Sequence, residues 1–182
     1  MPSDFVTALS ESSIRFDSII KPELLSVLGG DFRTVEGVTI DEMAKLLDTL
    51  AGIDVWHVDS LRGIRGLASR IQTAARDWHT FTIRKSRASG AKTEYEKRKF
   101  AIENGYLYPY FTMQAYIGEN DQRLISFAVA KTADIIKMID DGHCRENHTG
   151  HSQIGQANFY IVDWYEMKSL QYPIRIRGTN ES

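Results

Sequence analysis

The stretch LDTLAGIDVWHVDSLRGIRGLASRIQ, residues 47–72, decides the fold expected for this chain. Its middle, Ile53–Val58, is rich in residues that favour strands, and the letters SLRG that follow supply a turn. Ile64–Gln72 then returns as a second strand, so the sequence predicts a β-hairpin. Because side chains alternate along a strand, Arg70 and Gln72 are expected on the same face of this hairpin.

Two capping boxes mark helix starts on either side of the hairpin. In such a box a Thr hydroxyl and a Glu carboxylate satisfy the free backbone amides of the first turn. The first box, Thr39–Glu42, precedes apolar residues at helical spacing and predicts a helix over residues 40–50. The second box, Thr93–Glu96, predicts a helix that runs to about Asn104.

Further elements are expected outside this central part. Residues 3–30 have a weak helical pattern, with Pro22 in a first turn and the Gly29-Gly30 pair as a stop. Thr132 is expected to cap a helix that ends at Gly142. Strands are expected at residues 80–85, 110–117, 124–130, 158–164 and 174–176. This order predicts an α/β fold in which a single-domain mixed β-sheet is flanked by helices.

The size of the chain agrees with one domain. With 182 residues and 42% hydrophobic content, the chain can bury one core but is short for two independent domains. We therefore expect residues 1–182 to form a single domain. Its parts would be an N-terminal helical layer over 1–38, a core over 39–117, and strands and a helix over 118–182.

Cysteine content and hydropathy point to the cytoplasm. Cys144 is the only cysteine, so no intrachain disulfide can form and a reducing compartment is expected. The start MPSDFVTALSESS has neither the basic residues nor the apolar run of a secretory signal. No apolar stretch has the length needed to span a bilayer, so no membrane partner is expected.

Positive charge is concentrated in one part of the sequence. The formal net charge of -2 gives no overall attraction to nucleic acid. Between Arg62 and Lys99, however, eleven Lys and Arg face three Asp and Glu, which is 11 − 3 = +8. A flexible loop and a helix start lie in this region, and both suit phosphate oxygens. The residues expected to bind a nucleic-acid backbone are Arg84, Lys85, Arg87, Lys92 and Lys97. The alternative is an ordinary solvated helix with exposed ion pairs such as Glu94 with Arg98.

Carboxylates near the hairpin suggest a metal site. Hydrolysis of a phosphodiester needs an activated water and neutralised charge, and Mg²⁺ held by carboxylates supplies both. Asp54 begins a strand directly after Gly52-Ile53, and Asp48 lies six residues earlier at the expected helix end. Both are candidate metal ligands, with Arg70 and Gln72 expected to orient water or phosphate. The alternative for Asp54 is a turn cap or a structural ion pair with Arg70.

The hairpin resembles the PD-(D/E)xK, or restriction-endonuclease-like, nuclease superfamily. The residues that carry this resemblance are Gly52-Ile53-Asp54, which look like the family's Asp strand, and Arg70-Ile71-Gln72, which stand where the family has an acid-x-Lys pair. The resemblance covers roughly residues 39–117 and implies a metal-dependent nuclease. Because Arg cannot bind a metal and Gln carries no charge, a second carboxylate would have to complete the site. The candidates for it are Glu42, Asp48 and Glu94. The alternative is that the fold has lost its chemistry.

Other patterns leave further functions open. The zinc-ligand residue types His143, Cys144, His148 and His151 lie within nine residues, but their spacing matches no standard finger and also suits a polar loop. The sequence YLYPYF at 106–111 has aromatic rings that could stack on bases or pack in a core. We therefore expect a magnesium-dependent nuclease that acts on DNA or a related nucleic acid. The alternatives are a non-catalytic nucleic-acid-binding or inhibitory module and a partner-binding protein, including a homo-oligomer whose strands pair between copies.

Overall fold

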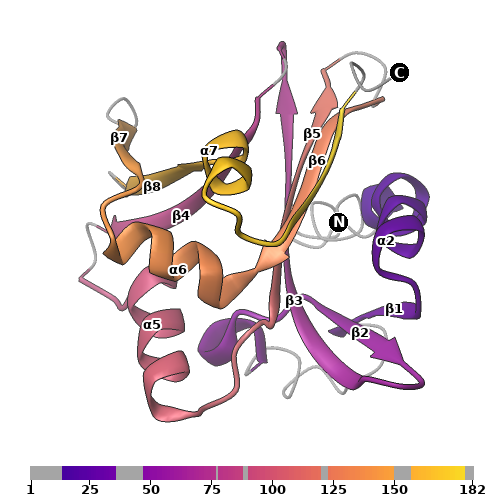
Figure 1. Ribbon diagram of the computed structural model, residues 1–182, viewed down its shortest axis with the longest axis horizontal. Helices are drawn as coiled ribbons and strands as arrows, with labels where there is room; N and C mark the ends of the chain where they lie inside the picture. The colour runs from indigo at the N-terminus through magenta and orange to yellow at the C-terminus, as the bar shows by residue number, and fades with distance from the viewer. Residues whose placement is uncertain are drawn as a thin grey trace, which may run out of the picture.

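A computed structural model describes residues 14–35, 47–76, 78–87, 90–119, 123–149 and 157–178. Two β-sheets form its framework, and the larger sheet stands between two layers (Figure 1). The fold is therefore mixed α/β, with a six-stranded mixed sheet flanked by helices. No helix within the described ranges is long and apolar enough to cross a membrane.

The six-stranded sheet contains the predicted hairpin. Its order is β1-β2-β3-β5-β6-β9, with β3 and β5 parallel and all other neighbours antiparallel. Two of its strands, β1 and β9, form the edges. The bounds are β1 (Asp31–Thr34), β2 (Val55–Asp59), β3 (Gly63–Ala74), β5 (Phe111–Gly118), β6 (Leu124–Lys131) and β9 (Ile174–Gly178).

A smaller, three-stranded antiparallel sheet packs beside it. Its order is β4-β8-β7, with β4 (Thr80–Arg87), β8 (Ala157–Asp163) and β7 (Arg145–Thr149). The helical elements are the π-helical turns η1 (Phe16–Ile20) and η2 (Leu47–Ala51), and the helices α2 (Lys21–Leu28), α5 (Glu94–Asn104), α6 (Thr132–Asp140) and α7 (Trp164–Ser169). In Figure 1, α2 lies on one side of the large sheet, while α5, α6 and the small sheet lie on the other.

Each face of the large sheet buries its own core. On the α2 side, Phe16, Ile20 and Leu24 pack against inward side chains of the sheet such as Leu67 and Met113. On the opposite side, residues of α6, α7 and the small sheet pack against the sheet, with fully buried Trp164, Phe81 and Ile135 among them. Arg70 and Gln72 of β3 project towards this second side, where apolar packing gives way to polar contacts.

Most predicted elements are confirmed. The hairpin, the strands at 110–117 and 124–130, and the helix capped by Thr93 occur close to their predicted bounds. Pro22 lies in the first turn of α2, and Gly29 ends that helix. The helix predicted over residues 40–50 lies mostly outside the described residues, which resume at Leu47 in η2.

Three expectations need correction. The strand at 80–85 does not join the large sheet: as β4 it pairs with β8 in the second sheet. Thr132 is the first residue of α6 rather than its cap, and its hydroxyl bonds to Thr112 at 2.8 Å. The strand expected to reach residue 164 ends at Asp163, whose carboxylate caps α7. The short strands β1 and β7 also lack a clear pattern in the sequence, because each is a polar edge strand.

Candidate nucleic-acid and metal site

Asp54 is placed by the close approach of two backbone segments. Gly52 has φ 65°, a left-handed conformation that glycine adopts without strain. Ile53, fully buried, then packs against Gly66 of β3, where an added Cβ would lie 2.6 Å from the Ile53 Cδ1 atom. The Asp54 amide donates to the Leu67 carbonyl at 3.0 Å, which fixes Asp54 at the start of β2.

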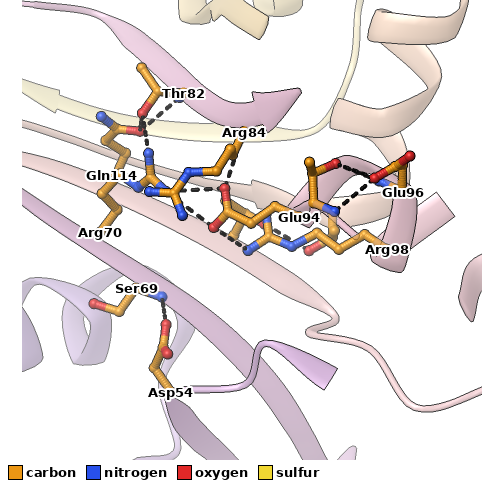
Figure 2. A network of polar contacts seen from close by, with 12 residues as sticks. Asp54, Ser69, Arg70, Thr82, Arg84, Glu94, Glu96, Arg98 and Gln114 are labelled. Atoms are coloured by element: carbon orange, nitrogen blue, oxygen red, sulfur yellow. Dashed lines mark hydrogen bonds and ion pairs between the residues drawn. The ribbon is translucent and has the colours of Figure 1, made fainter. Parts of the chain in front are cut away.

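The Asp54 carboxylate turns back onto the neighbouring strand. Its Oδ2 atom accepts a hydrogen bond from the Ser69 amide at 2.7 Å, and the side chain is half-buried. The charge of Arg98, a residue of α5, also interacts with Asp54. Figure 2 shows Asp54 and Ser69 apart from the polar network that surrounds Glu94. Asp54 is therefore close to that network electrostatically but belongs to a different hydrogen-bonded pair.

Arg70 is held by Glu94, the first residue of α5. The Arg70 Nη2 atom lies 3.1 and 3.0 Å from the two Glu94 carboxylate oxygens, and its Nη1 atom donates to the Thr82 hydroxyl at 3.0 Å. The guanidinium also lies over the Phe159 ring, 5.6 Å from its centroid. The ion pair of Arg70 that the structure shows is thus made with Glu94, one of the three carboxylates considered for completing the site.

Glu94 lies among three arginines from three elements (Figure 2). Besides Arg70 of β3, its carboxylate accepts a hydrogen bond from the Arg84 backbone amide of β4 at 2.9 Å and pairs with Arg98 at 3.5 Å. Burial raises the pKa of the Glu94 carboxyl, but the charges of Arg98 and Arg70 and the Arg84 amide outweigh burial and hold that pKa below its ordinary value. Arg70, Arg84 and Arg98 face the two carboxylates of Glu94 and Asp54, which is 3 − 2 = +1, an excess of one positive charge.

Arg98 is the most buried cation of the cluster. Only 5% of the residue is exposed, and its Nη1 atom has no hydrogen-bond partner among the described residues. A buried charged group normally has its donors satisfied, because an unmade bond to a charge is costly. Burial and the charge of Arg70 lower the pKa of Arg98, while the charges of Glu94 and Asp54 favour its charged form.

Gln72 takes part in a second, linked network. Its Oε1 atom accepts a hydrogen bond of 2.6 Å from Nε2 of Gln114 on β5. Gln114 is 1% exposed and also bonds to Thr82 and to the Tyr116 hydroxyl. Gln114 was not among the residues predicted from the sequence, although a single amide within the apolar strand 110–117 is a signal that could have pointed to it.

The five predicted backbone-binding residues lie in different surroundings. Arg84 is half-buried with its guanidinium over Phe159, and Lys85 pairs with Glu146 of β7. Lys92 is exposed, with its Nζ atom 5.1 Å from the centre of the Phe100 ring, and Lys97 is half-buried. The side chain of Arg87 lies outside the described part of the chain. Of these residues, Lys92 has the most open position.

Magnesium binding by the described residues stays a prediction. Asp54 offers a carboxylate, which is the ligand type that Mg²⁺ prefers. Glu94 does not fit this role in the observed arrangement, because Arg70 bonds to both of its oxygens. No group of three His, Cys, Asp or Glu side chains within the described ranges is placed to hold a metal. Asp48 lies in η2 with its side chain outside the described part, as does the whole of Glu42.

Of the candidate zinc residues, His143 and Cys144 lie just before β7. His143 contacts Glu166 through its Nδ1 atom at 3.2 Å, and Cys144 packs against the core beneath β8. Burial, together with the negative charge of Glu146, raises the pKa of the Cys144 thiol and so disfavours the thiolate that zinc binds. The His148 side chain and all of His151 lie outside the described residues, so zinc binding stays a prediction.

Searches among protein-family models, curated proteins and solved structures each found no match to this chain.

Proposed function

We propose that this protein acts on nucleic acid and that its reaction is metal-dependent hydrolysis of a phosphodiester bond. The observation that carries the proposal is the arginine cluster around Glu94, formed by Arg70, Arg84 and Arg98. Arginine is suited to phosphate because its charge is permanent and its donors lie in one plane. The excess positive charge on this face complements a phosphodiester backbone.

The order of the elements supports the nuclease-like part of the proposal. A strand hairpin that begins next to Asp54 is followed by α5 and by β5, which lies parallel beside β3. This is the order expected of a restriction-endonuclease-like core, with β4 as an addition that leaves the large sheet. The likeness of Asp54 to the family's metal-binding Asp is thus accompanied by a similar framework.

The roles in the proposed reaction follow from the chemistry of the side chains. Asp54 would hold Mg²⁺, which supplies water activation and charge neutralisation when bound. Gln72 and Arg70 would contact the phosphate, and Lys92 with Lys97, Arg84, Lys85 and Arg87 would contact the flanking backbone. These contacts are independent of base identity, so we expect little sequence preference from them.

One observation favours a second candidate, a nucleic-acid-binding module without catalysis. Both oxygens of Glu94 are bonded to Arg70, and so Glu94 does not complete a metal site with Asp54 in this arrangement. A module of this kind would bind phosphates through the same arginines. The two candidates share a ligand and differ only in whether the bond is cleaved.

One experiment separates the two candidates. Fluorescence anisotropy of a labelled duplex in EDTA measures binding, and gel analysis after addition of Mg²⁺ or Mn²⁺ measures cleavage. The nuclease proposal predicts salt-sensitive binding followed by metal-dependent cleavage. Binding without cleavage in either metal would support the module, and the absence of both would contradict the proposal as a whole.

A further inference from the structure

The backbone determines which end of the Gln114 side-chain amide is the oxygen and which is the nitrogen. The Thr82 backbone amide can only donate, so the Gln114 atom that it contacts at 2.9 Å is the carbonyl oxygen. The other end of the Gln114 side chain must then be the amide nitrogen. It donates to Gln72 Oε1 at 2.6 Å and to the Tyr116 hydroxyl at 2.8 Å.

The hydrogen bonds of the Tyr116 and Thr82 hydroxyls agree with this assignment of the Gln114 oxygen and nitrogen. The Tyr116 hydroxyl donates to the backbone carbonyl of Thr80 at 3.0 Å, and a backbone carbonyl can only accept. The Thr82 hydroxyl accepts from Arg70 Nη1 and donates to Gln114 Oε1 at 3.1 Å. Gln114 thus makes two accepted and two donated bonds, which satisfies its amide completely.

The assignment of Gln114 also determines which polar atom of Gln72, an exposed residue, points outward. Because its carbonyl oxygen is bonded inward to Gln114, its amide nitrogen is the polar group left on the outer side. That nitrogen has no hydrogen-bond partner among the described residues. Arg70, two positions earlier on the same face, also has donors only. The Glu94 carboxylate, the acceptor bonded to Arg70, also accepts from the Arg84 amide.

We propose that Gln114 is a positioning residue that makes Gln72 a hydrogen-bond donor, so that this face of β3 selects an acceptor-only ligand, a phosphate oxygen of nucleic acid. This inference rests on the proposed function and deepens it. On its outer side Gln72 then offers no acceptor to an attacking water, because the outward group is an amide nitrogen, which cannot accept a hydrogen bond. The phosphate contact and the orientation of water are therefore assigned to different residues.

The first test measures, in the free protein, whether the side-chain NH₂ group of Gln72 points outward to water. Side-chain amide signals in a ¹⁵N-¹H NMR spectrum can be assigned to Gln72 and Gln114 from the signals missing in Gln72→Met and Gln114→Met. We expect the NH₂ protons of Gln72 to exchange rapidly with water and those of Gln114 to be protected. Protection of the Gln72 amide would overturn the inference, and this readout does not depend on any nucleic-acid activity.

The second test measures recognition with inorganic pyrophosphate and a 5′-phosphorylated dinucleotide as probes. Both should shift the Gln72 amide signal. Gln72→Met should weaken binding of the dinucleotide by about 5-fold. Gln72→Glu, which presents an acceptor and a negative charge, should weaken this binding by more than about 20-fold. Absence of the shift, or Gln72→Glu binding as well as Gln72→Met, would overturn the inference.

A third variant, Gln114→Glu, should reverse the orientation of the Gln72 side-chain amide. Gln114→Glu still accepts from Thr82 but cannot donate to Gln72, so Gln72 should turn its amide inward and its carbonyl oxygen outward. We expect slow exchange of the Gln72 amide and dinucleotide affinity as low as in Gln72→Met. Unchanged affinity in a folded Gln114→Glu protein would contradict a positioning role. If this variant does not fold, the two Gln72 variants decide, since Gln72 is exposed. Probe binding with no duplex binding or cleavage would contradict the proposed function alone.

Discussion

Glu94 has a pKa below its ordinary value of 4.5, because Arg98, Arg70 and the Arg84 amide outweigh the effect of burial. A depressed folded-state pKa stabilises the protein above the unfolded-state pKa, and this stabilisation is lost as the pH falls through the folded-state value. The contribution of Glu94 is therefore complete well above pH 4.5 and is lost in acid as the pH falls through the lower folded-state pKa.

The first prediction concerns Glu94→Gln. We expect it to lower the free energy of unfolding at pH 7 by about 2 kcal/mol, because the arginines lose their carboxylate. Below the folded-state pKa the two proteins should converge in stability. Urea unfolding between pH 3 and 7 measures this. Glu103→Gln, an exposed change on the same helix, is the matched control and should alter stability by less than about 0.5 kcal/mol. A constant difference between Glu94→Gln and wild type at every pH would contradict the role of the Glu94 charge.

The second prediction concerns Gly66, whose missing side chain allows Ile53 to pack. A Cβ here would lie 2.6 Å from Ile53 Cδ1, and Ile53 is fully buried, so Gly66→Ala should destabilise the protein by about 1–3 kcal/mol. It should also displace Asp54 and reduce any cleavage. Thermal unfolding and a cleavage assay measure the two effects. Gly178→Ala is the control, since the nearest atom to its Cβ is 3.7 Å away. Equal stability of the two variants would show that the packing at Gly66 is loose.

At the scale of single elements, α5 connects the site to the rest of the fold. Thr93, which is 2% exposed, forms a capping box with Glu96: the Thr93 amide donates to the Glu96 carboxylate at 2.8 Å. The same helix start holds Glu94, and the next turn holds Arg98. The cap therefore fixes the position of both charged residues.

The third prediction follows from this cap. Thr93→Ala should lower the free energy of unfolding by about 1 kcal/mol, and Thr93→Ser should retain most of it because the hydroxyl can still accept the Glu96 amide. If α5 positions the arginine cluster, Thr93→Ala should also weaken duplex binding measured by anisotropy. Loss of stability with fully retained duplex binding would contradict a role of the Thr93 cap in positioning the arginine cluster.

The elements that the sequence predicted best are those whose signal is local. The Thr93 capping box and the strand over residues 64–72 are specified by neighbouring residues, and both appear in the structure. The pairing of β4 with β8 joins residues far apart in the sequence, such as Thr82 and Ile161, which are 161 − 82 = 79 positions apart, and no local pattern specifies it. The edge strands β1 and β7 are short and polar, so their pattern resembles that of a loop.

The site was predictable in the same limited way. Arg70 and Gln72 were expected on one face because strand alternation is a local property, and the hydrogen bonds to Thr82 and Gln114 confirm this. That Arg70 would pair with Glu94 depends on where α5 packs, which is a tertiary contact. Asp54 as a metal ligand stays a prediction, and in the structure its carboxylate accepts a hydrogen bond from the Ser69 amide.

At the scale of the whole molecule, the fourth prediction concerns the salt dependence of nucleic-acid binding. With a formal net charge of -2, binding must come from the local basic face, and its affinity should fall as salt rises. Lys92→Gln should reduce the slope of log affinity against log salt by about 0.9, since each phosphate contact contributes about that amount. Lys168→Gln, an exposed change on α7, is the control and should leave the slope unchanged. Equal slopes of log affinity against log salt for wild type and both variants would show that Lys92 makes no phosphate contact.

The fifth prediction is the most direct test of a nuclease function. The cleavage rate of a labelled duplex in Mg²⁺ is compared between wild type and Asp54→Asn, with the exposed Asp17→Asn as the matched control. We expect metal-dependent cleavage by wild type and by Asp17→Asn, and a rate at least about 100-fold lower for Asp54→Asn, because loss of a ligand should exceed the effect of losing an outer contact. Wild-type cleavage that persists in EDTA, or an Asp54→Asn rate equal to wild type, would contradict the proposal.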